Sequence, residues 1–127
     1  MKTTNAERCK KYREKNKEKI KDYRQSEEQK EYHKNYRKSA KGQKSTTISG
    51  WKYAGLISDD YDSIYDRYIN TTECDCCKKP IKEGKGSRVM DHCHETKKFR
   101  NILCHNCNIL RFHFDNNYQA YLRMMTL

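Results

Sequence analysis

The sequence predicts a small, mostly helical α+β protein, in which a zinc-clasped strand-strand-helix unit follows a long basic helical arm. Two observations lead to this fold class. The chain has no Gly or Pro between Thr3 and Lys41, a stretch rich in Lys, Glu, Arg and Gln, which favour helix. Further along, two C-x-x-C pairs enclose two short segments that can form strands.

The composition favours a metal as a stabilising element. Hydrophobic residues make up 34% of the 127 residues and charged residues 35%, so a conventional core cannot extend through the whole chain. A bound metal is a common remedy in small proteins. The seven cysteines cannot all pair within one chain, and they are concentrated in C-x-x-C pairs. Both features favour metal binding over disulfides.

The basic arm is predicted to span residues 1–44. Residues 1–50 carry 16 Lys and Arg against 7 Asp and Glu, a net charge of +9, whereas the rest of the chain carries +2. This asymmetry indicates a polyanionic partner, and DNA is the expected one. We expect one long helix, interrupted near Gln25 and Ser26, that is either a solvated arm or a helix that follows phosphates. The candidate DNA-binding residues are Lys10, Lys11, Arg13, Lys17, Lys21, Arg24, Lys34, Arg37 and Lys38.

Residues 45–73 are predicted to hold a linker and an amphipathic aromatic helix. A glycine and several Ser and Thr favour a linker over residues 40–49. Asp59 and Asp60 are candidate N-cap residues for the helix that follows. Four residues beyond them follow helical spacing and are expected to pack, with Trp51, against the cysteine-bearing unit: Tyr61, Ile64, Tyr65 and Tyr68.

The zinc-clasped unit is predicted to span residues 74–115. Two C-x-x-C pairs, with 26 residues between them, supply four thiolates that suit a closed tetrahedral structural Zn²⁺ site: Cys74, Cys77, Cys104 and Cys107. We call these four residues the zinc clasp.

Three elements are expected inside and after the zinc clasp. Residues 87–92 and 98–103 are short enough for the two strands of a hairpin. Cys104 is then expected to open a helix, and residues 116–127 have apolar side chains at the spacing of a short C-terminal helix.

Residues 73–112 resemble the phage recombination endonuclease VII family, within the HNH or His-Me finger nucleases. The resemblance rests on the first C-x-x-C pair, on D-H-C-H at residues 91–94 and on F-R-N-I-L-C-H-N-C-N at residues 99–108. It implies a ββα-metal unit that hydrolyses phosphodiester bonds of DNA. Lys97 and Asn101 stand where the family usually has Gly, so we expect a longer turn or a non-Gly residue at positive φ there.

The resemblance also implies site residues. His92 would activate water, because the pKa of imidazole lies near neutral pH. Asp91 and Asn108 would supply oxygen ligands for Mg²⁺, with Mn²⁺ able to substitute. His94 shares a face with His92 and would contact phosphate or metal, or else be structural. Arg100 is expected to contact phosphate.

Two function classes follow from this sequence. The first is a Mg²⁺-dependent DNA endonuclease with a structural zinc, and the alternative is a non-catalytic zinc-ribbon protein that binds nucleic acid. Asp91, His92 and Asn108 favour the enzyme, because a binding module needs no acid, base and amide at these positions. No signal peptide or membrane-length apolar run is visible, and we expect a cytoplasmic protein, in the host cytoplasm if a phage or virus encodes it. The DNA target, the mode of cutting and the oligomeric state are left open.

Overall fold

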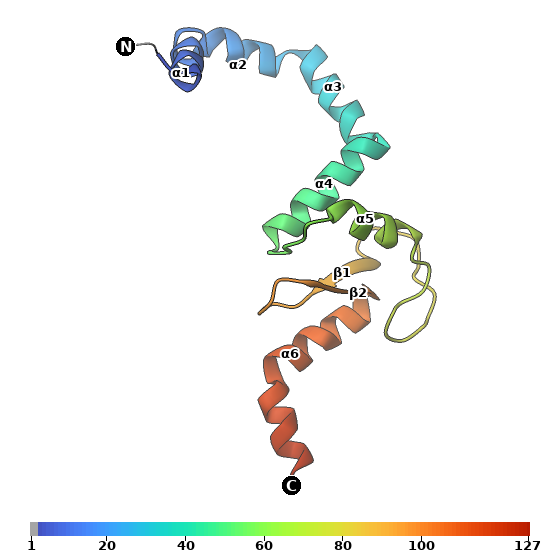
Figure 1. Ribbon diagram of the computed structural model, residues 1–127. Helices are drawn as coiled ribbons and strands as arrows, with labels where there is room; N and C mark the ends of the chain where they lie inside the picture. Colours follow the sequence, from blue (N-terminus) through green and yellow to red (C-terminus); the bar gives the residue numbers. More distant parts are fainter. Residues whose placement is uncertain (1–2) are drawn as a thin grey trace. The chain divides into compact units, whose positions relative to one another are not determined.

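The computed structural model describes residues 3–127 and divides the chain into two compact units, one ending at Thr46 and the other beginning at Thr47 (Figure 1). The first unit is helical, and the second contains the two strands. The elements in chain order are α1 (Asn5–Lys15), α2 (Lys17–Gln25), α3 (Glu27–Lys38), α4 (Ala40–Tyr53), α5 (Tyr61–Asn70), β1 (Arg88–His92), β2 (Phe99–Cys104) and α6 (His105–Met125).

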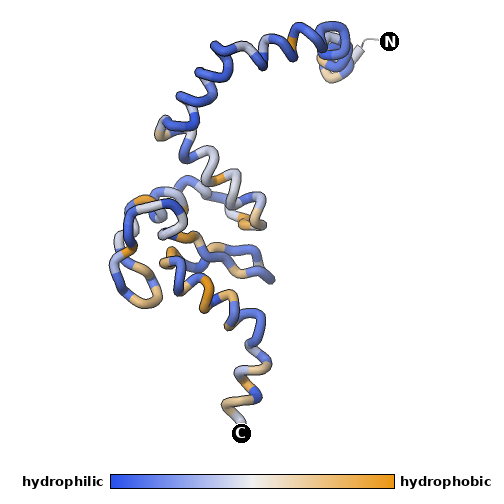
Figure 2. The backbone as a smooth tube through the Cα atoms, turned by 180° about the vertical axis from the view of Figure 1, so that it is seen from behind, coloured by the Kyte–Doolittle hydropathy of each residue, from blue (hydrophilic) through white to orange (hydrophobic). Residues whose placement is uncertain are grey.

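Helices α1 to α3 of the first unit are short, and none of them buries a residue. Thr4 and Glu7 form a capping box at the start of α1, and the Ser26 hydroxyl accepts a hydrogen bond from the Gln29 N–H at the start of α3. The predicted interruption near Ser26 is confirmed. A further break at Asn16 divides what the sequence predicts as one helix. Figure 2 shows that these helices are hydrophilic along most of their length.

Helix α4 corrects the prediction of a linker over residues 40–49. The hydroxyl of Ser39 accepts a hydrogen bond from the Gly42 N–H at 3.1 Å and so caps the first turn. A Cβ added at Gly42 would lie 1.9 Å from the carbonyl oxygen of Tyr36, so only glycine fits where the chain passes from α3 into α4. Trp51, near the end of the helix, is buried, and its packing offsets the weak helix propensity of this segment.

Helix α5 is the predicted amphipathic aromatic helix. Asp60 caps it by accepting a hydrogen bond from the Ser63 N–H at 2.9 Å, as the sequence predicts. Before this cap, α4 ends and the chain reverses at Gly55, whose φ of 104° is a left-handed value that suits glycine.

The two strands pair antiparallel, with bounds within one residue of the predicted ones. Asp91 lies opposite Asn101 and His92 lies opposite Phe99, so the register skips Arg100, which forms a bulge in β2. The bulge turns the side chain of Arg100 out of the regular alternation of the strand.

The turn that joins β1 to β2 closes through two backbone hydrogen bonds. The Cys93 N–H donates to the Lys98 carbonyl at 2.9 Å, and the Lys97 N–H donates to the Cys93 carbonyl at 2.8 Å. Lys97 has a φ of 61°, which confirms the expected non-Gly residue at positive φ. Asn101, at the second position where the family usually has Gly, is an ordinary strand residue and has no positive φ.

The core of the second unit lies between the hairpin, α4 and α5. Trp51 packs against the rings of Tyr65 and Tyr68, with centroid distances of 6.2 and 5.3 Å. This confirms that Trp51 and the aromatic stripe pack onto the cysteine-bearing unit. The buried residues of the core are Trp51, Leu56, Ile64, Met90 and Ile102. A second, smaller cluster joins Leu103 of β2 to two cysteines, Cys74 and Cys107.

Helix α6 begins directly after Cys104, as predicted, and contacts both strands. Its backbone departs from helical geometry at Asn117, so the C-terminal part forms a separate helical segment close to the predicted residues 116–127. Across the described part of the chain, no helix combines the length and the apolar character needed to cross a membrane.

Candidate functional site

The four cysteines of the zinc clasp lie together in the second unit. Their Sγ atoms are all within 4.8 Å of one another, and the Sγ atoms of Cys77 and Cys104 are 3.9 Å apart. A tetrahedral zinc with Zn–S bonds of about 2.3 Å requires sulfur atoms about 3.8 Å apart. The side chains therefore fit a Zn²⁺ ion. Within residues 3–127, no other group of three or more His, Cys, Asp or Glu side chains has comparable spacing.

A tight turn shapes the first cysteine pair of the clasp, and a helix start shapes the second pair. The Lys78 N–H donates to the Cys74 carbonyl at 3.0 Å, which closes the turn that carries the first pair. In the second pair, Cys104 is the N-cap of α6, and its sulfur accepts a hydrogen bond from the Cys107 N–H at 3.5 Å. The helix start thus holds two cysteines of the clasp one turn apart.

Asp75 ties the first cysteine pair to β2. Its carboxylate accepts a hydrogen bond from the Ile102 N–H at 2.8 Å, while its own N–H donates to the Ile102 carbonyl at 3.0 Å. Arg67 of α5 also contacts this carboxylate, at 2.8 Å. The clasp is therefore anchored to the same strand that forms half of the hairpin.

The pKa values of the buried cysteines differ according to their surroundings. Burial raises the pKa of Cys74, but backbone N–H groups of Cys104, Cys77 and Cys76 outweigh this effect and lower the pKa to about 6. Burial and the neighbouring sulfur atoms raise the pKa of Cys107 well above its usual value. A cation would be needed to hold all four side chains as thiolates. Cys76 is exposed and lies outside the cluster, as the C-x-x-C spacing predicts.

Asp91 is a buried acid held by an arginine. Only 6% of its surface is exposed. The Nε of Arg100 donates to one carboxylate oxygen of Asp91 at 2.8 Å, and the Nη2 of Arg100 donates to the other at 2.9 Å. The same Nη2 donates to Asp115 of α6 at 2.7 Å. The guanidinium predicted to contact phosphate is thus engaged with two acids, and its phosphate contact stays a prediction.

His92 is the buried histidine of the hairpin, with 9% of its surface exposed. Burial lowers its pKa, and the neighbouring His94 lowers it further, while Asp91 and the carbonyl of Ala54 act in the opposite direction. The net shift is downward, so the imidazole is neutral at neutral pH. A Cβ added at Gly55 would lie 4.0 Å from Nε2 of His92, so this side of the ring faces the loop after α4.

The other two predicted site residues are His94 and Asn108. The rings of His92 and His94 have centroids 5.1 Å apart, and His94 is exposed. His94 lies in the turn after β1, so strand alternation does not determine which way its side chain faces. Asn108 lies in the first turn of α6, directly after Cys107, and is half-buried. Its side chain makes no hydrogen bond to any residue between 3 and 127, so its amide oxygen is available to a ligand.

The nine candidate DNA-binding residues of the basic arm are all exposed in the first unit. Most of their neighbours are polar, and tyrosines such as Tyr12 and Tyr23 are also exposed, at 65% and 62%. The arm therefore presents both cations and flat aromatic rings to solvent.

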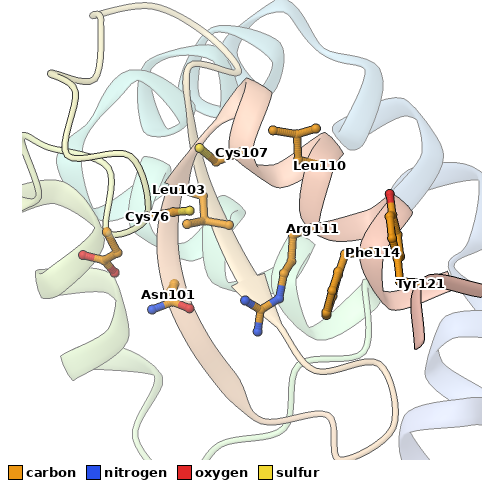
Figure 3. A pocket seen from close by; sticks show the side chains of 9 residues that line it. Cys76, Asn101, Leu103, Cys107, Leu110, Arg111, Phe114 and Tyr121 are labelled. Carbon is orange, nitrogen blue, oxygen red and sulfur yellow. The ribbon is translucent and has the colours of Figure 1, made fainter. Parts of the chain in front are cut away.

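Sequence reasoning missed Asp115 and a cavity beside α6. Asp115 lies seven residues after Asn108, a spacing of two helical turns that could have indicated a shared face. The cavity has a volume of about 700 Å³ (Figure 3). Its walls come from the first cysteine segment, β2 and α6: Asp75, Cys76, Asn101, Leu103, Cys107, Leu110, Arg111, Phe114 and Tyr121.

Comparison with known proteins identifies a family for the second unit. The family model of recombination endonuclease VII matches residues 48–126. No curated protein and no solved structure matches the chain. The matched segment contains the clasp, the hairpin and all of α6, and it is more than half of the chain. The chain therefore belongs to the recombination endonuclease VII family, a family of DNA endonucleases.

Proposed function

We propose that this protein is a Mg²⁺-dependent DNA endonuclease in which His92 activates the attacking water. The observation that carries the proposal is the environment of His92, a buried and neutral imidazole that follows Asp91 in the family-matched segment. A neutral imidazole is the form that can accept a proton. Nδ1 is the nitrogen we assign to this role, because Nε2 faces the backbone near Gly55.

Asp91 and Asn108 are the residues that would hold Mg²⁺. Carboxylate and amide oxygens are the ligands that this ion prefers, and the Asn108 side chain has no competing hydrogen bond among the described residues. When bound, the ion would neutralise charge on the scissile phosphate and the leaving oxygen. The exposed ring of His94 is suited to contact a phosphate oxygen beside His92.

The zinc clasp has a structural role in this proposal. Asn108 directly follows Cys107 in α6, and Asp75 links the first cysteine pair to β2. A zinc ion held by the clasp would therefore fix the helix that carries Asn108 against the strands that carry Asp91 and His92. Four thiolates leave no open coordination position, so this zinc would not take part in the reaction.

The basic arm would supply affinity for DNA. Exposed Lys and Arg side chains bind phosphates with little dependence on base sequence and release counterions as they do so. The arm carries most of the excess positive charge of the chain. Binding through the arm would raise the local concentration of DNA at the hairpin.

The proposal is tested by incubating purified protein with supercoiled, linear and branched DNA, with and without Mg²⁺. Cleavage is expected only with Mg²⁺, and Mn²⁺ is expected to replace it. Asp91→Ala and Asn108→Ala should both reduce cleavage and weaken divalent binding while they retain zinc. DNA binding without cleavage of any of the three substrates would favour the alternative, a zinc-ribbon protein that binds nucleic acid.

A further inference from the structure

Arg100 occupies the carboxylate that the proposed Mg²⁺ site needs. Both oxygens of Asp91 accept a hydrogen bond from its guanidinium, at 2.8 and 2.9 Å. The exposed fractions of the two side chains are 19% for Arg100 and 6% for Asp91, so solvent screens this ion pair little. A divalent ion at Asp91 must therefore share the carboxylate with the guanidinium or displace it.

The bulge in β2 explains why Arg100 reaches Asp91. The strand register pairs Asp91 with Asn101 and passes over Arg100. In a regular strand, Arg100 and Asn101 would point to opposite faces. Bulges commonly redirect a side chain next to a functional site, and here the redirected side chain lies along the carboxylate of Asp91.

Asp115 gives the guanidinium a second anchor. It accepts a hydrogen bond from Nη2 of Arg100 at 2.7 Å, and it is more exposed than Asp91, at 28%. Asp115 also lies 3.6 Å from Nε of Arg111 on the same helix. Arg100 therefore joins β2 to α6 and can leave Asp91 while it keeps a charged partner.

We propose that Arg100 is a positioning residue that blocks Asp91 in the metal-free protein, and that it moves onto Asp115 when a divalent ion binds. The inference rests on the proposed Mg²⁺ site. Moving the guanidinium frees N–H groups that previously donated to Asp91, and these can donate to a phosphate oxygen of the DNA. Binding of a divalent ion would thus free Asp91 to coordinate the ion and free Arg100 to contact a phosphate.

This exchange predicts opposite effects for its two partners. Arg100→Gln removes the competing cation, so divalent ions should bind more tightly. Asp115→Asn removes the alternative partner, so Arg100 should stay on Asp91 and divalent ions should bind more weakly. In the Arg100→Gln background, Asp115→Asn should have little further effect, because the exchange no longer exists.

The experiment titrates full-length, zinc-loaded protein with Mn²⁺ in the absence of DNA and follows free Mn²⁺ by electron paramagnetic resonance. We expect the dissociation constant to fall about threefold or more in Arg100→Gln and to rise about threefold or more in Asp115→Asn. Arg88→Gln and Asp66→Asn are the charge-matched controls, since neither side chain contacts Asp91 or Arg100, and both should bind like the parent.

Zinc content and circular dichroism show whether each variant is folded. If Arg100→Gln does not fold, Arg100→Lys provides a second test. Lysine keeps the charge but cannot hold both oxygens of Asp91, so tighter Mn²⁺ binding than in the parent is again expected. Weaker binding in both the Arg100 and the Asp115 variants would overturn the inference and indicate a purely structural role. Absence of Mn²⁺ binding in the parent and all variants would instead overturn the proposed metal site, and this inference with it.

Discussion

Lys97 combines backbone strain with an electrostatic effect on His92. Its φ of 61° lies in the left-handed region, where a side chain costs about 1 kcal/mol or more relative to glycine. Its carbonyl accepts a hydrogen bond from the Ile57 N–H at 2.8 Å, which ties the turn to the loop after α4. Its positive charge also lowers the pKa of His92. The residue is therefore unfavourable for the turn but helps to keep His92 neutral.

Lys97→Gly is expected to stabilise the zinc-loaded protein by up to about 1 kcal/mol, because glycine relieves the strain. The measurement is urea unfolding of the second unit with zinc present throughout. Lys98→Gly is the matched control, because the neighbouring lysine has no positive φ and glycine there should destabilise. A loss of stability in Lys97→Gly equal to that in Lys98→Gly would contradict this explanation.

The pKa of His92 should be visible in an NMR titration of the Mg²⁺-free protein. The imidazole is expected to titrate below 6.5, with burial as the main cause and His94 as the second. His94→Gln should therefore raise the pKa of His92, whereas His113→Gln on α6 should leave it unchanged. Because the pKa of His92 is lower in the folded than in the unfolded chain, its stabilising contribution is present above pH 6.5 and is lost as the pH falls through the folded pKa. A pKa above 6.5 would contradict the assigned environment.

Helices and strands were predicted correctly from the sequence where short-range patterns determine them. The hairpin, α5 and the start of α6 follow from short patterns: strand-length segments, an Asp cap and a C-x-x-C pair at a helix start. The linker prediction was wrong because Ser, Thr and Gly composition does not reveal the burial of Trp51. The interaction of Arg100 with Asp115 was also not predicted, because it depends on a bulge that only the strand register reveals.

Two glycines of α4 provide a matched test of its start. Gly42→Ala should destabilise the helical first unit by about 1–3 kcal/mol, because the added Cβ would meet the Tyr36 carbonyl oxygen at 1.9 Å. Gly50→Ala meets nothing within 4 Å and should stabilise α4 by about 0.5–1 kcal/mol. Thermal unfolding followed by far-UV circular dichroism compares the two. Equal stability of the two variants would show that α3 and α4 do not approach as described.

The two units of the molecule differ in charge and burial, and we propose that the first supplies DNA affinity and the second the chemistry. The first unit has no buried residue in α1, α2 or α3 and carries most of the positive charge, while the second unit contains the core, the clasp and the family match. Charge and cysteine spacing predict a basic arm at residues 1–44 and a clasped unit at residues 74–115, and the roles of these segments stay predictions. The site residues Asp91, His92, His94 and Asn108 came from the family resemblance, and their roles remain proposals.

Salt dependence tests the role assigned to the first unit. Replacing Lys10, Lys17 and Lys21 with Gln in the full-length chain should reduce the slope of log affinity against log salt concentration by about 0.9 for each DNA phosphate that is no longer neutralised. Replacing Lys79, Lys82 and Lys85 is the control with the same change in charge, and its slope should change less. Fluorescence anisotropy with duplex DNA in EDTA measures both without cleavage. A larger change in the control would assign the electrostatic binding of DNA to the second unit.

Plasmid nicking by His92→Ala in the presence of Mg²⁺ tests whether His92 is the general base of a DNA endonuclease. The variant should keep its zinc, its fold and its DNA affinity, but its cleavage rate should fall by at least ~10²-fold, the usual contribution of a general base. His113→Ala, which changes an exposed histidine of α6, should cut like the parent. Cleavage by His92→Ala at the parental rate, with zinc and fold intact, would contradict the role of His92 as the general base.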